Sequence, residues 1–74
     1  MNQPVLKANE IIKALKFYGF KIVRQTGSHV RLRHEDGRVT SVPFHAGQDV
    51  GKGLLRKILR DTELNLEDIL KALD

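Results

Sequence analysis

The alternation of apolar and polar side chains in residues 29–34 constrains the fold more than any other feature of the sequence. Val30 and Leu32 alternate with His29, Arg31 and Arg33. Because successive side chains of a β-strand point to opposite faces, this pattern predicts a strand with one buried face and one face open to water. Half-covered strands of this kind are typical of antiparallel sheets. The segment therefore predicts an antiparallel sheet with a cover on one face.

The turn after this strand sets its register with the next strand, which residues 38–42 are expected to form. A two-residue loop would place Arg31 opposite Val42. A three-residue loop, residues 35–37 with the glycine in a left-handed conformation, instead places Val30 opposite Val42. The second register pairs apolar side chains with each other, so it is the one we predict.

The remaining periodicities predict one more strand and three helices. Apolar residues recur at helical spacing from Ala8 to Tyr18, from Val50 onward and in residues 66–73, whereas residues 20–25 alternate as a strand. Ile22 of the strand and Leu70 of the last helix are expected on the covered sides of their elements.

Single residues mark the ends of these elements. Gly19 is expected to cap the first helix in a left-handed conformation. Pro43, which has no N–H to donate, is expected to end the third strand. Asp49 is expected to cap the second helix, and Asn65 with Asp68 forms a capping box for the third.

These elements in the order α-β-β-β-α-α predict an α+β fold, in which a three-stranded antiparallel sheet carries helices on one face. Residues 1–6 are expected to form an N-terminal tail, within which Val5 and Leu6 are able to dock. Residues 7–74 are expected to form a single domain.

Size and composition limit the chemistry that this domain can carry. A chain of 74 residues leaves little room for a deep enclosed cavity, so any site is expected on an open surface. The absence of cysteine excludes disulfides, thiolate catalysis and cysteine zinc sites. The apolar runs are too short for a membrane span or a signal peptide, so a cytoplasmic protein is expected. The net charge of +4 favours an anionic partner, nucleic acid before membrane, although it also serves solubility.

Motifs for nucleotide hydrolysis, metal binding and serine catalysis fail on their spacing. Gly47 and the segment 51–53 lack the spacing and the Ser or Thr of a phosphate-binding loop. The three histidines have no clustered carboxylates beside them, so neither a metal nor another cofactor is expected. Ser28 and His29 are neighbours on a strand and face opposite ways, so they are no catalytic dyad.

The outer face of the strand at residues 29–33 is the strongest candidate site. It carries His29, Arg31 and Arg33 in a row, with Lys21 as a candidate neighbour. Histidine exchanges protons near neutral pH, and guanidinium groups hold phosphates and stabilise charge that develops on them. RNA brings its own nucleophile, the 2′-hydroxyl, so these side chains suit metal-independent cleavage of RNA but not of DNA. The plain alternative is a strand that merely shows its polar side to water.

A second histidine, His45, follows Pro43 in the loop before the second helix. The N-terminus of a helix attracts anions, so His45 is a candidate acid to complement His29 as base. The plain alternative is a loop histidine that only hydrogen-bonds to a carbonyl group.

Four segments, in this order and spacing, resemble the HicA family of mRNA interferase toxins. They are Gly19-Phe20, residues 24–29 (Arg-Gln-Thr-Gly-Ser-His), residues 42–45 (Val-Pro-Phe-His) and residues 52–59 (Lys-Gly-Leu-Leu-Arg-Lys-Ile-Leu). The resemblance extends from about Leu6 to Leu70. The chain departs from the family at Leu54, where threonine is usual, and at Ala46, where glycine is common.

The resemblance implies a double-stranded-RNA-binding-like fold, cleavage of mRNA and silencing by a HicB antitoxin. It places the catalytic role on His29, with Gly27 and Ser28 shaping the preceding turn and His45 as a supporting residue. Because His29 is intact, an active toxin is expected. Together with the charge pattern, the resemblance leads us to expect RNA binding by Lys21, Arg24, Arg31, Arg33, Lys52 and Arg56.

Three functions stay open on the sequence. The first is a ribonuclease toxin of a type II toxin–antitoxin system, the second an RNA-binding module without catalysis, and the third an interaction domain whose basic face meets an acidic protein. RNA and a HicB-type antitoxin are the expected partners of the first; a membrane and direct DNA binding are not expected.

Overall fold

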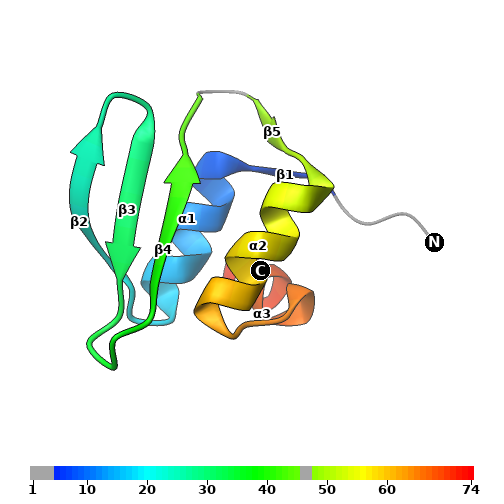
Figure 1. The fold of residues 1–74 in the computed structure, drawn as a ribbon. Coiled ribbons are helices and arrows are strands. Elements are labelled where there is room, and N and C mark those ends of the chain that lie inside the picture. Colours follow the sequence, from blue (N-terminus) through cyan, green and yellow to red (C-terminus); the bar gives the residue numbers. More distant parts are fainter. Residues whose placement is uncertain (1–4, 46–47) are drawn as a thin grey trace.

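The computed structural model describes residues 5–45 and 48–74, and Figure 1 shows the arrangement of their elements. The expectations for residues 1–4, Ala46 and Gly47 lie outside these ranges. The helices are α1 (Ala8–Phe17), α2 (Lys52–Thr62) and α3 (Leu66–Leu73). The strands are β1 (Leu6–Lys7), β2 (Lys21–Thr26), β3 (His29–Arg33), β4 (Val39–Pro43) and β5 (Asp49–Val50).

The main sheet has the antiparallel order β2-β3-β4, which confirms the predicted α+β class. Val30 pairs with Val42 and Leu32 with Thr40, and all four residues are buried. Gly37 has a φ of +102°, in the left-handed region. The predicted three-residue loop and its register are therefore confirmed.

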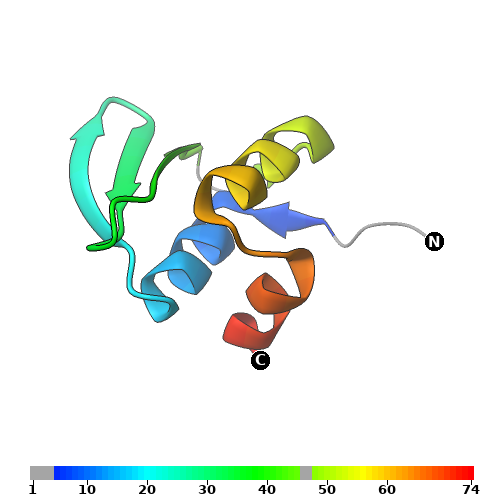
Figure 2. The same ribbon diagram turned by 60° about the horizontal axis from the view of Figure 1, so that its bottom comes forward.

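Helices α1 and α2 lie on one side of this sheet, and no described helix lies on the other (Figures 1 and 2). Helix α2 packs along β4, and α3 packs against α1 instead of the sheet. The fully buried side chains between the layers include Ile11, Leu15, Phe20, Leu32, Val42, Ile58 and Ile69. One face of the sheet is thus free to carry a site.

The start of α2 differs from the prediction. Asp49 does not cap a helix but pairs with Lys7 in a two-stranded sheet of β1 and β5, in which Leu6 pairs with Val50. Helix α2 begins at Lys52 with Gly51 as its N-cap, so the predicted cap at Asp49 was wrong. The pairing holds Leu6 in the core, whereas Val5 is exposed.

The other predicted caps are confirmed. Gly19 follows α1 with a φ of +95°. At the start of α3 the Asp68 N–H donates to Asn65 Oδ1 at 2.8 Å, and the Asn65 N–H donates to Asp68 Oδ2 at 3.0 Å. These reciprocal bonds satisfy N–H groups that a helix start leaves unpaired.

Two residues expected on covered sides are partly open to solvent. Ile22 pairs with buried Leu32 and so lies on the predicted side of the strand, but it is 41% exposed. Leu70 is 38% exposed, so its predicted inward position was wrong. β2 is an edge strand that contacts mainly β3, so the helices cover little of it. Helix α3 packs mainly against α1, and its fully buried residue there is Ile69. No helix in the described ranges is long and apolar enough to span a membrane.

Candidate functional site

The uncovered face of the main sheet carries the predicted row of side chains. His29, Arg31 and Arg33 are exposed, and Val30 and Leu32 between them are buried in the core. The structure therefore places the histidine and both arginines on one open face, as the alternation predicts.

β2 brings two more cations to this face, Lys21 in regular register and Arg24 through a bulge at Val23. Lys21 pairs with Arg33 and, after a one-residue shift in register, Arg24 pairs with Arg31. Residues directly opposite each other share a face of the sheet, so both cations lie beside the β3 row. Without the extra residue, Arg24 would lie on the helix-covered face. The bulge was not predicted from the sequence, where its only signal is that apolar Val23 interrupts the alternation.

These side chains form what we call the cationic face: His29 together with Lys21, Arg24, Arg31 and Arg33. All five are exposed. The ion pairs among the described residues lie elsewhere, so no carboxylate of those ranges neutralises the cationic face. Uncompensated cations on an open surface attract anionic ligands.

A tight turn sets the position of His29. Gly27 and Ser28 form a two-residue loop between the paired residues Thr26 and His29. Gly27 has a φ of +57°, and glycine with positive φ at the first loop position is typical of a type II′ hairpin turn. The turn thus places His29 at the start of β3, at one end of the sheet.

A main-chain hydrogen bond ties the segment before His45 to this turn. The Phe44 N–H donates to the Ser28 carbonyl oxygen. On β4, Pro43 is the Cα partner of His29, and His45 follows two residues later. Both histidines predicted to act on RNA are therefore brought to the same end of the sheet.

The surroundings of His45 differ from the predicted anion site. His45 lines a hollow of about 160 Å³ together with Pro43, Asp49 and Leu54. Asp49 contributes a carboxylate and Leu54 no hydroxyl, so neither favours an anion in the hollow itself. His45 is exposed and so can also meet a ligand outside it.

Lys52 and Arg56 do not join the cationic face. Both are exposed on α2, which packs on the covered side of the sheet along β4. The spacing of residues along the chain predicts which face of a helix is exposed, but not where that helix packs on the sheet. The sequence therefore could not show that Lys52 and Arg56 lie away from the cationic face. Lys52 is the first residue of α2 and follows β5, near the end of the molecule that carries His45 (Figure 1).

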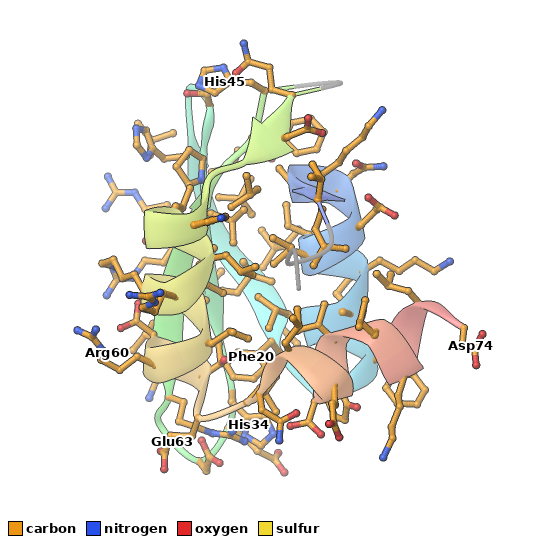
Figure 3. The ribbon with its side chains drawn as sticks, turned by 90° about the vertical axis from the view of Figure 1, so that its right-hand side faces the viewer. Phe20, His34, His45, Arg60, Glu63 and Asp74 are labelled. Carbon is orange, nitrogen blue, oxygen red and sulfur yellow. The ribbon has the colours of Figure 1, made fainter. Side chains whose placement is uncertain are left out.

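The third histidine, His34, lies at the end of the molecule opposite His45 (Figure 3). Its ring packs edge-on against Phe20 with centroids 5.1 Å apart, and its Nδ1 lies 3.1 Å from Oδ1 of Asp36. Arg38 packs on the same Phe20 ring and donates through Nε to both carboxylate oxygens of Asp36. These bonds from Arg38, more than the charge of His34, hold the pKa of Asp36 below its ordinary value of 3.8.

Within the part of the chain described, no group of three His, Asp or Glu side chains could hold a metal ion.

A family model described as the HicA toxin of bacterial toxin–antitoxin systems matches residues 8–64 of the 74-residue chain. The chain belongs to the HicA toxin family. No curated protein matched the sequence. The matched range includes the whole cationic face, the turn before His29, and His45. As a HicA toxin, the protein has the toxin role in a toxin–antitoxin system, in which an antitoxin is its partner.

Proposed function

We propose that this HicA toxin is a metal-independent endoribonuclease that cleaves mRNA and thereby blocks translation. The observation that supports the proposal best is the exposed His29 in line with Arg31 and Arg33 on the uncovered face of the sheet. Cleavage of a phosphodiester requires proton transfer and stabilisation of negative charge, and an imidazole among guanidinium groups offers both.

In the proposed reaction His29 acts as general base on the 2′-hydroxyl of a bound nucleotide. The 2′-oxygen attacks the adjacent phosphorus, and the bond from phosphorus to the 5′-oxygen of the next nucleotide breaks. The products are a 2′,3′-cyclic phosphate and a 5′-hydroxyl. His45, at the same end of the sheet, is the proposed acid that protonates the departing oxygen, while Arg31 stabilises charge on the phosphoryl oxygens.

The remaining cations are proposed to bind the RNA backbone. Lys21, Arg24 and Arg33 contact phosphates on either side of the scissile bond. Lys52 and Arg56, on their separate surface, contact RNA that extends past the His45 end of the sheet. Gly27 and Ser28 act through the turn that positions His29.

The proposed antitoxin is of the HicB type and silences the toxin in the cytoplasm, where its mRNA substrates are. An uncovered active face needs a cover, and acidic side chains would complement the cationic face electrostatically.

The His29→Ala variant tests the ribonuclease proposal. Purified wild-type toxin is expected to cleave a synthetic RNA in the presence of EDTA and to leave DNA of the same sequence intact. The variant should bind the RNA with unchanged affinity but lose cleavage by at least about 100-fold, the usual contribution of a general base. Lys71→Gln, on α3 away from the sheet, is the matched surface control. Cleavage that survives in His29→Ala would contradict the assignment.

The second candidate function is an RNA-binding module without catalysis. Four cations of the cationic face would bind RNA in such a module without a chemical role for His29, namely Lys21, Arg24, Arg31 and Arg33. Salt-sensitive RNA binding by the wild type without cleavage under any tested condition would favour it.

A further inference from the structure

The side of β2 facing away from the cationic face carries an apolar groove. The groove has a volume of about 190 Å³ and lies between α1 and β2. Ile12 of α1 and Ile22 and Gln25 of β2 form its sides, and Val30 and Phe44 also line it. Ile22 pairs with buried Leu32 and thus points to the helix side, yet it is 41% exposed.

The outer edge of β2 has no strand partner in the described ranges. β2 pairs with β3 alone, and all six of its residues are exposed. Edge strands offer unpaired N–H and C=O groups to any extended segment that can lie beside them. Val23, at the bulge, is 55% exposed and adds a second large apolar side chain to this edge. An open edge and an open apolar groove therefore meet along one strand.

Charge determines which segment suits this edge. Lys21 and Arg24 of β2 lie on the cationic face. On α1, Lys13 and Lys16 are exposed and lie one helical turn beyond the groove residues Asn9 and Ile12. A second copy of this chain would bring its own β2 cations against these, and like charges at an edge oppose pairing. An acidic partner is attracted by the same charges.

We propose that the β2 edge and the α1–β2 groove bind an extended acidic segment of the antitoxin. A strand added beside β2 would alternate its side chains: apolar ones beside Ile22 in the groove, and carboxylates beside Lys21 and Arg24 on the cationic face. The segment would thus neutralise the outer cations of that face while anchored on the other side of the strand. This inference needs the antitoxin that family membership implies, but not the ribonuclease chemistry.

The test compares two isoleucine-sized side chains of nearly equal exposure. Ile22→Gln is expected to weaken binding of the antitoxin by at least 10-fold in calorimetry, whereas Leu70→Gln, 38% exposed on α3, should change it less than 2-fold. RNA binding by Ile22→Gln should match the wild type, because Ile22 lies on the other side of β2 from the cations. RNA cleavage that survives in His29→Ala would contradict the ribonuclease proposal but would not alter either result, so the two proposals fail separately.

Hydrogen exchange on the wild-type complex gives a readout that does not depend on a variant folding correctly. Main-chain amides of β2 should exchange at least 10-fold more slowly when the antitoxin is bound. Unchanged exchange in β2, or equal antitoxin affinity of Ile22→Gln and the wild type, would overturn the proposal. Dimerisation of the toxin alone that is lost in Ile22→Gln would also overturn it, because the occupant would then be a second copy.

Discussion

Arg24 of β2 lies directly opposite Arg31 of β3 on the uncovered face of the sheet. Two like charges in opposed positions destabilise a sheet, and neither arginine forms an ion pair with another described residue. A bulge in β2 is what brings them together. The fold therefore maintains an unfavourable charge pair that an RNA phosphate between the two guanidinium groups would stabilise.

Replacing Arg24 with glutamate should stabilise the protein and weaken RNA binding at the same time. The variant places a carboxylate opposite Arg31 and should raise the free energy of unfolding by about 0.2–1 kcal/mol, measured by urea denaturation. Affinity for single-stranded RNA should fall, and the slope of log K against log salt should become shallower by about 0.7 for each phosphate that the variant no longer binds. Lys71→Gln should leave that slope unchanged. A less stable Arg24→Glu variant would show that the arginine pair is not repulsive.

Two glycine-to-alanine changes should have opposite effects on stability. Gly19 has a φ of +95°, and a Cβ there would lie 3.0 Å from Nε2 of His34. Gly19→Ala should therefore lower the free energy of unfolding by about 1–3 kcal/mol. Gly53 lies in α2, and beyond its chain neighbours and the helix's own backbone no atom of the described residues lies within 4 Å of the position that an alanine methyl group would take. Gly53→Ala should therefore raise the free energy of unfolding by about 0.4–1 kcal/mol. Chemical denaturation of both variants measures these changes in the free energy of unfolding. Equal changes in the two variants would contradict the left-handed cap at Gly19.

The Asp36 carboxylate should make stability depend on pH in the acid range. Hydrogen bonds from Arg38 lower the pKa of Asp36 in the folded protein below its ordinary value of 3.8. A lowered folded pKa means that the carboxylate contributes stability above the unfolded pKa, and that this contribution is lost as pH falls through the folded pKa. The difference in melting temperature between wild type and Asp36→Asn should therefore be largest above about pH 5 and shrink below about pH 4. A difference that stays constant across this range would show that the Asp36 charge does not contribute.

The parts of the fold that sequence reasoning found are those with local signals. The β3–β4 register followed from alternation of Val30 and Leu32 and from one glycine-containing turn, all within a few residues. The β1–β5 pairing has two residues per strand, so it shows no periodicity, and it joins Leu6 to Val50 across most of the chain. That long-range pairing displaced the local capping preference of Asp49.

The arrangement of the candidate residues could be predicted within one strand but not where several elements meet. His29, Arg31 and Arg33 follow from a period of two. Alternation along a strand does not reveal an inserted residue. The sequence therefore could not show that Arg24 shares a face with Arg31, which results from the bulge seen in the structure. Lys52 and Arg56 were expected to bind RNA, but the sequence does not give their position relative to the sheet, and the packing of α2 along β4 separates them from the cationic face.

The bond between the Phe44 N–H and the Ser28 carbonyl oxygen uses main-chain atoms only. Side chains at both positions can therefore change in the course of evolution without releasing the loop that carries His45 from the turn that carries His29. Proline at position 44 is the exception, since it has no N–H to donate. The main chain itself thus holds the segment that carries His45 close to the turn that carries His29, and a sequence with the same backbone path and no proline at position 44 keeps this contact.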